Sequence, residues 1–272
     1  MLIGNPMMLR QLPIEDALER MKTLGYEGIE VCLPDIQACK TSVLKRQFNE
    51  SVRSFGLTLI RYNTAAADYF TPLAHPDDWP RVLEGLKQDI DTAAALGVPH
   101  LLAWEGRPPP GASREEIHGW ALDATTRLFQ DAIPYARQHG VHLSVEVHPF
   151  TMGIDTAFLV TLCDRLDPEW FSVTYDCCHF GVGLPEGYIE AVHALGRRIQ
   201  HIHFSDSDRH SSELHFAPGA GCLDLPGIVR ALKAIGFHGT CMLDLWLYPF
   251  PIEGSRIGVP YLRRVMDELG IH

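Results

Sequence analysis

The sequence predicts an α/β fold, a single-domain (β/α)8 barrel (TIM barrel), over residues 1–272. Three observations indicate this fold. Eight short apolar runs alternate with eight helical patterns from one end of the chain to the other, which indicates a parallel sheet that closes into a barrel. The length suits one such domain, since these barrels commonly have about 250 residues. Several helical patterns also end in a glycine directly before the next apolar run, as a left-handed helix terminus requires.

The expected elements follow one another regularly. The strands are Leu2–Asn5, Gly28–Cys32, Leu57–Tyr62, His100–Trp104, His142–His148, Phe171–Cys177, Ile199–Phe204 and Thr240–Leu245. The helices are Ile14–Leu24, Ser42–Phe55, Pro80–Leu96, Ser113–His139, Thr156–Leu166, Gly187–Arg198, Leu225–Ile235 and Pro260–Leu269. The alternative is an open doubly wound sheet, but the GxGxxG turn expected after its first strand does not occur in the sequence.

Composition and charge narrow the classes of function that the protein can have. The net charge of -11 and the lack of any Lys/Arg run argue against a nucleic-acid partner. No apolar run approaches the length of a membrane span, and the first residues lack the pattern of a secretory signal. The seven cysteines are irregularly spaced without a CxxC pair, which is typical of a reduced setting. We therefore expect a cytoplasmic protein without membrane contact.

Four of the expected strands carry an acid or a histidine near the carboxyl end. These residues are Glu146, Asp176, His203 and Asp244. Strands of a parallel barrel are normally filled with apolar side chains, because an unpaired buried charge is costly. The carboxyl ends meet at one mouth of the barrel, so we expect the four side chains to converge there.

Three carboxylates around one imidazole would repel one another unless a cation lay between them. We therefore predict one divalent metal ion held by Glu146, Asp176, His203 and Asp244. Mn2+ is the ion we expect, and Mg2+, Co2+ or Zn2+ would suit the same donors. The alternative is that hydrogen bonds satisfy each polar group separately.

Other polar and aromatic residues at strand ends are candidates for the wall of a substrate pocket. Glu30 and Glu105 end the second and fourth strands and either line the pocket or form ion pairs at its rim. His148 lies on the same strand face as Glu146 and would contact substrate or support the metal site. Trp104 and Trp246 would provide apolar walls.

At these residues the sequence resembles the xylose-isomerase-like barrels, a family that includes ketose 3-epimerases, hydroxypyruvate isomerase and inosose dehydratase. Gly25-Tyr-Glu-Gly-Ile-Glu30 matches the family's second strand. Asp176 and His179 reproduce its Asp-x-x-His motif, and His203 is the second histidine of its His-x-His strand. The resemblance implies that His179 and Arg209 bind the substrate, and that the metal ligands are those named above.

Three features depart from the family pattern. Asp244 stands where the family usually has glutamate, and Met152 stands where ketose 3-epimerases place a glutamate that contacts the sugar. The endonuclease IV branch of the family has additional histidines on the third and fourth strands, which are missing near the carboxyl ends of those strands here. Asp208-Arg-His210 resembles that branch's later ligands, but two ligands do not complete its zinc cluster.

The resemblance implies a metal-dependent isomerase or epimerase of a small sugar or keto-sugar that reacts through an enediolate. Glu146 and Asp244 would exchange the proton on opposite faces of the substrate. Two alternatives stay open: a dehydratase of a keto-cyclitol or dehydroshikimate type, and a barrel that binds sugar without turnover. The family often dimerises, so the resemblance also implies a homodimer.

Overall fold

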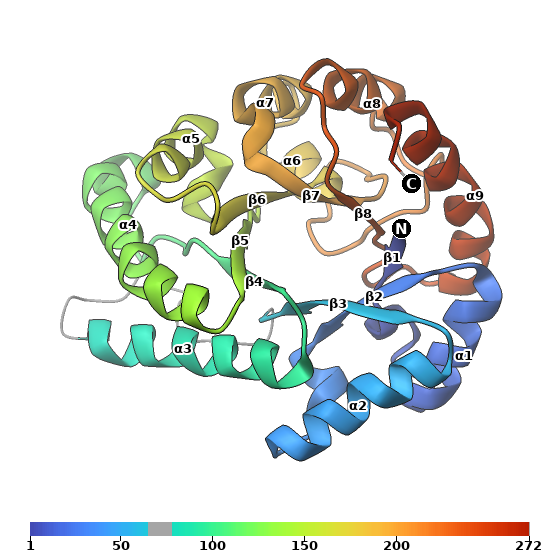
Figure 1. Ribbon diagram of the computed structural model, residues 1–272. Coiled ribbons are helices and arrows are strands. Elements are labelled where there is room, and N and C mark those ends of the chain that lie inside the picture. The colour runs from blue at the N-terminus through green and yellow to red at the C-terminus, as the bar shows by residue number, and fades with distance from the viewer. Residues whose placement is uncertain (65–77, 272) are drawn as a thin grey trace.

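The computed structural model describes residues 1–64 and 78–271 and shows a closed barrel of eight parallel strands (Figure 1). Strand β1 pairs with β2 and with β8, which closes the sheet. The strands are β1 (Leu2–Gly4), β2 (Gly28–Cys32), β3 (Thr58–Asn63), β4 (His100–Trp104), β5 (His142–Glu146), β6 (Phe171–Asp176), β7 (Ile199–Phe204) and β8 (Thr240–Leu243). The predicted fold class and its single domain are confirmed.

Helices surround the barrel as an outer ring (Figure 1). They are α1 (Ile14–Leu24), α2 (Ser42–Ser54), α3 (Trp79–Leu96), α4 (Arg114–Gln138), α5 (Thr156–Asp164), α6 (Cys177–Gly183), α7 (Tyr188–Leu195), α8 (Leu225–Ala234) and α9 (Pro251–Leu269). The apolar core lies between this ring and the outer face of the sheet, where Val145, Val173 and Ile202 are fully buried. Among the residues that the structure describes, no helix is both long and apolar enough to cross a membrane.

Two helices differ from the sequence prediction. The sequence did not predict α6, whose first turn is capped by Asp176: the Oδ1 atom accepts a hydrogen bond from the backbone N of His179 at 2.8 Å. Helix α9 begins at Pro251 rather than at Pro260, because Pro251 occupies the first-turn position that suits proline and Pro260 is accommodated inside the helix.

Polar side chains from β3, β5 and β6 meet on the inner face of the barrel. The guanidinium Nη2 of Arg61 donates to Ser144 Oγ at 2.5 Å and lies 3.4 Å from Thr174 Oγ1, so one side chain from β3 joins β5 and β6. The β6–β7 register shifts between Val173 and Thr174, which places Asp176 directly beside His203. At the carboxyl ends of these strands, the inward-facing positions are occupied by the predicted acids and histidine.

Strands β5 and β8 end earlier than the sequence predicted. His148 and Asp244 consequently lie just beyond β5 and β8. Asp244 remains aligned with the sheet, because its backbone N donates to the carbonyl of Phe204 at 3.1 Å.

Candidate active site

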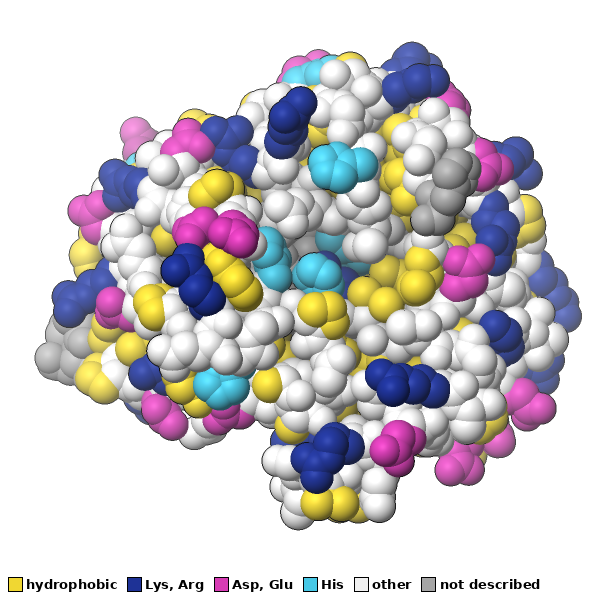
Figure 2. Space-filling model, viewed as in Figure 1, with side chains coloured by type: hydrophobic (Ala, Val, Ile, Leu, Met, Phe, Trp, Pro, Cys, Tyr) yellow, Lys and Arg dark blue, Asp and Glu magenta, His cyan; other side chains and the backbone are white. Residues whose placement is uncertain are grey.

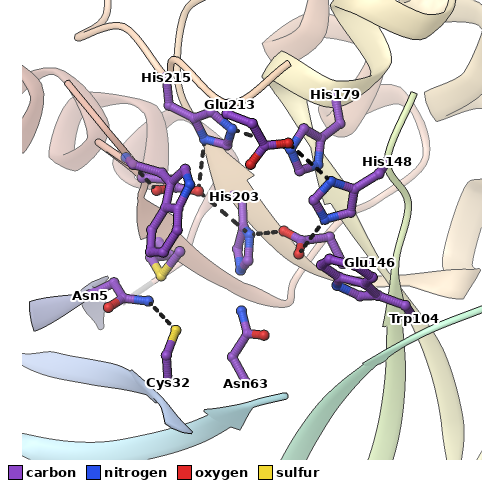
Figure 3. A pocket seen from close by; sticks show the side chains of 13 residues that line it. Asn5, Cys32, Asn63, Trp104, Glu146, His148, His179, His203, Glu213 and His215 are labelled. Carbon is purple, nitrogen blue, oxygen red and sulfur yellow. Dashed lines mark hydrogen bonds and ion pairs between the residues drawn. The ribbon is translucent and has the colours of Figure 1, made fainter. Parts of the chain in front are cut away.

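A pocket opens at the carboxyl-terminal mouth of the barrel. Figure 2 shows a hollow near the centre of this face, with histidine side chains inside it and hydrophobic side chains beside it. The empty space in this hollow, together with the open solvent at its mouth, is about 500 Å3. The described residues that line it are Asn5, Cys32, Asn63, Trp104, Glu146, His148, His179, His203, Glu213, His215, Met242, Asp244 and Trp246 (Figure 3).

The predicted acids and histidine converge at the base of this pocket. The Nδ1 atom of His203 contacts Glu146 Oε1 (Figure 3). The same atom lies 3.6 Å from Asp176 Oδ2 and 3.8 Å from Asp244 Oδ2. All four residues are at most 6% exposed. Glu146, Asp176 and His203 have ligand atoms close enough together to hold one metal ion.

His215 belongs to the same cluster and was missed by the sequence analysis. Its Nδ1 atom lies 2.8 Å from Asp244 Oδ2 and 3.8 Å from Asp176 Oδ2, and its Nε2 atom lies 3.3 Å from His179 Nε2. The residue lies in the long β7–α8 loop, where an isolated bridge between Asp206 and Phe216 folds the chain back toward the mouth.

His215 could not be identified from the sequence by strand periodicity, because it lies in a loop. The loop motif that the sequence analysis noted was Asp208-Arg-His210. In the structure, Asp208 Oδ1 accepts hydrogen bonds from the backbone N atoms of His210 and Ser211 at 2.8 and 2.7 Å, so Asp208 stabilises its own turn.

The electrostatics of the cluster favour a bound positive charge. Burial by itself would raise the pKa of the Glu146 carboxyl, but the adjacent His203 and His148 hold that pKa well below its usual value. Burial likewise opposes protonation of His203 and His215, yet the surrounding carboxylates raise the pKa of both imidazoles well above the usual value. The Glu146 carboxylate thus stays charged next to a positive charge, which protons on His203 and His215 supply when no ion is bound.

The donor set also fits a metal ion. Asp176 Oδ2, His203 Nδ1 and His215 Nδ1 are buried and make no well-formed hydrogen bond within the part of the chain that the structure describes. Buried polar atoms without hydrogen-bond partners are rare and call for an explanation such as an ion. Direct ion pairs within the cluster, such as His215 Nδ1 with Asp244 Oδ2 at 2.8 Å, are the alternative to a bound ion.

The wall of the pocket is aromatic and imidazole-rich. The Trp104 ring lies 4.2 Å from that of His148, which in turn lies 3.9 Å from the His179 ring, measured between centroids. Burial lowers the pKa of His179 to about 4, so its imidazole is neutral at pH 7. The pKa of His148 shifts in the opposite direction: burial would lower it, but the ion pairs with Glu146 and Glu213 raise it to about 9. Trp246 lies across the pocket beside Asp244.

Two residues that the sequence indicated as candidates for substrate contact, Glu30 and Arg209, do not line the pocket. Glu30 is fully buried below the pocket, where Oε2 lies 3.3 Å from Arg61 Nε, so it forms an ion pair instead of lining the cavity. Arg209 turns away because its Nη2 donates to the carbonyl of Pro185 and to Glu186 Oε1, the latter at 2.8 Å. Neither is among the described residues that line the pocket.

Two further residues noted in the sequence, Met152 and Glu105, are buried and do not line the pocket. Met152 is fully buried beneath the pocket wall, with its backbone N donating to the carbonyl of Gly106 at 2.9 Å. Glu105 is also fully buried, and its Oε1 accepts a hydrogen bond from the backbone N of Gly153 at 2.6 Å. A further carboxylate that lines the pocket, besides Glu146 and Asp244, is that of Glu213, whose Oε1 lies 3.7 Å from His148 Nδ1.

The fold and the site define a class: parallel (β/α)8 barrels that gather acids and histidines at the carboxyl-terminal mouth. The family model described as "Xylose isomerase-like TIM barrel" matches residues 18–265, and the chain belongs to that family.

Individual relatives are distant. Fructoselysine 3-epimerase of Escherichia coli O157:H7 is 24% identical over 251 residues, which cover 87% of this chain and 86% of that protein. The crystal structure of a D-tagatose 3-epimerase-like protein superposes with a TM-score of 0.79 at 17% identity, covering 98% of this chain and 99% of the other. The IOLI protein, whose structure is described as having a binding zinc atom, gives a TM-score of 0.74 at 20% identity, covering 98% and 97%.

Proposed function

We propose that this protein is a divalent-metal-dependent isomerase or epimerase of a small sugar or keto-sugar. The observation that carries the proposal is the buried cluster of Glu146, Asp176, His203 and Asp244 at the base of a pocket. The similarity to a fructoselysine 3-epimerase and to a tagatose 3-epimerase-like structure supports a carbohydrate substrate.

Glu146, Asp176, His203 and Asp244 would hold the ion, for which we propose Mn2+. Mg2+, Co2+ and Zn2+ suit the same mixture of carboxylates and imidazole. When bound, the ion would supply Lewis acidity that polarises a substrate carbonyl and stabilises the enediolate formed from it.

Glu146 and Asp244 would move the proton. Glu146 comes from β5 and Asp244 follows β8, so the two carboxylates approach the pocket from different strands. One removes the proton from the carbon beside the carbonyl, and the other returns a proton to the opposite face. Both oxygens of Asp244 are oriented, since Oδ1 accepts from the backbone N of Trp246 at 2.9 Å and Oδ2 faces His215 Nδ1.

The pocket wall would position the substrate. Neutral His179 and protonated His148 offer hydrogen bonds to substrate oxygens, and Glu213 provides an acceptor beside them. Trp104 and Trp246 would pack against the apolar faces of a sugar. Arg209, held by Pro185 and Glu186, is not needed in this arrangement.

Deuterium exchange tests the proposal. The manganese-loaded protein would be incubated in D2O with a panel of keto-sugars and keto-cyclitols and followed by NMR. We expect deuterium at the carbon next to the carbonyl, together with an isomeric product, and no exchange with His203→Ala. Loss of water from the substrate would identify a dehydratase instead. Tight sugar binding without exchange would identify a non-catalytic sugar-binding barrel.

A further inference from the structure

A buried ion pair lies directly beneath the pocket. Glu30 from β2 and Arg61 from β3 are 0% and 2% exposed, and Glu30 Oε2 lies 3.3 Å from Arg61 Nε. Glu30 Oε1 accepts a hydrogen bond from Asn63 Nδ2 at 2.9 Å. Arg61 also contacts Ser144 on β5 through Nη2. Glu30 is therefore fixed to the strands that surround the base of the site.

The same carboxylate reaches the histidine of the proposed metal site. Glu30 Oε2 makes a long hydrogen bond, 3.5 Å, with His203 Nε2. The opposite ring nitrogen, Nδ1, faces Glu146 and Asp176. Because an ionised carboxylate only accepts hydrogen bonds, the proton on this side of the ring must belong to Nε2. A neutral His203 then keeps its free electron pair on Nδ1, directed at the carboxylates.

We propose that Glu30 is a positioning residue, which fixes His203 in the Nε2–H tautomer and thereby presents Nδ1 to the metal ion. The inference rests on the metal site of the proposed function. A carboxylate that accepts from the outer nitrogen of a ligating histidine fixes the orientation of the ring and increases its basicity as a ligand. Glu30 does not touch the pocket, so it acts only through His203.

The competing explanation is that Glu30 only neutralises Arg61. The neighbouring His201 also faces Glu30, with its Nε2 3.7 Å from Glu30 Oε2, while its Nδ1 lies 2.6 Å from Thr240 Oγ1. His203 Nε2 lies closer to this oxygen, at 3.5 Å, and of the two histidines it is the one that forms a hydrogen bond with it; the same oxygen also faces Arg61. If charge neutralisation were the whole role, removing the carboxylate would alter stability and leave metal affinity and the His203 tautomer unchanged.

Metal titration of the full-length protein gives the first readout. After treatment with EDTA, the wild type, Glu30→Gln and Glu105→Gln would be titrated with Mn2+ by calorimetry. Glu105 is the matched control, because it is equally buried and follows β4, but its carboxylate accepts from Gly153 N. We expect Glu30→Gln to lose about 10- to 100-fold in Mn2+ affinity, the usual effect of losing such a partner. Glu105→Gln should stay within about twofold of the wild type.

The His203 tautomer gives the second readout. In the zinc-loaded protein, long-range 1H–15N correlation would show a single Nε2–H tautomer with Nδ1 bound to the ion in the wild type. We expect Glu30→Gln to show mixed or weakened Nδ1 ligation. If Glu30→Gln does not fold, Glu30→Asp is the second variant. It retains the negative charge but moves the carboxylate oxygen away from His203 Nε2. It should still lose more Mn2+ affinity than Glu105→Gln.

Three results would overturn the inference: unchanged Mn2+ affinity in Glu30→Gln, an unchanged tautomer there, or an equal loss in Glu105→Gln. A wild-type protein that binds no divalent ion would overturn both this inference and the metal site. Normal metal binding without any sugar turnover would overturn the proposed reaction alone.

Discussion

Replacement of Asp244 by asparagine should separate metal binding from proton transfer. An asparagine Oδ1 can still accept from the backbone N of Trp246, a contact of 2.9 Å in the structure. The amide that replaces Oδ2, which lies 2.8 Å from His215 Nδ1, can no longer take up a proton. We expect a loss of about 10²–10⁴ in kcat, the usual contribution of general acid–base catalysis, which corresponds to about 3–5 kcal/mol of transition-state stabilisation.

The assay is steady-state turnover of the substrate identified by deuterium exchange, with bound metal measured in the same samples. Asp244→Glu is the matched control, since it keeps the carboxylate and restores the residue usual in the family. Glu146→Gln should lose a similar amount, and the double variant should be little worse than either single one, because groups that act as a unit are not additive. If Asp244→Asn retains metal and near-normal turnover, the two-carboxylate mechanism is wrong.

Three further predictions concern the metal and protonation. Metal analysis should find one ion per wild-type chain and strongly reduced occupancy in His203→Ala and Asp176→Asn; full occupancy in both would refute the ligand set. EDTA should lower the melting temperature and Mn2+ should restore it, because an ion that binds only the folded state stabilises it; an unchanged transition would argue against this. In the metal-free protein, the raised pKa of His148 should contribute stability that is complete below about pH 6.5 and lost as pH rises through about 9. The loss should be about 3 kcal/mol, at 1.36 kcal/mol for each tenfold change in proton affinity, and denaturant unfolding of His148→Gln should lack this step.

The fold could be predicted from the sequence because periodicity and helix-ending glycines repeat through the whole chain. Helix α6 could not, since Cys177–Gly183 is too short to show a helical pattern and depends on the cap from Asp176. Within the site, Glu146, Asp176 and His203 were visible as polar residues inside apolar strands. Their placement in one cluster agrees with the expected inward orientation, and their roles remain a proposal.

The rest of the site depended on contacts between distant segments. His215 and Glu213 lie on a loop, and only the folded chain shows that they face His179 and His148. The direction of a strand-end side chain is also set by its neighbours. Glu30 was expected either to line the pocket or to form an ion pair at its rim. The arginine on β3 binds it below the pocket, and that pairing was not apparent in either strand alone.

The pocket is built from two parts that differ in how freely they can change. Glu146, Asp176 and His203 are fixed by strand register, and a shift of one residue would turn them out of the barrel. His215 and Glu213 come from residues 205–224, a connection whose length is not set by the sheet, and such loops tolerate insertions and substitutions. Under the proposed function, substrate preference could therefore diverge by exchange of this one loop while the barrel and the acids of the proposed metal site stay unchanged. The β7–α8 connection is then the natural segment to graft when the proposed sugar specificity is to be changed.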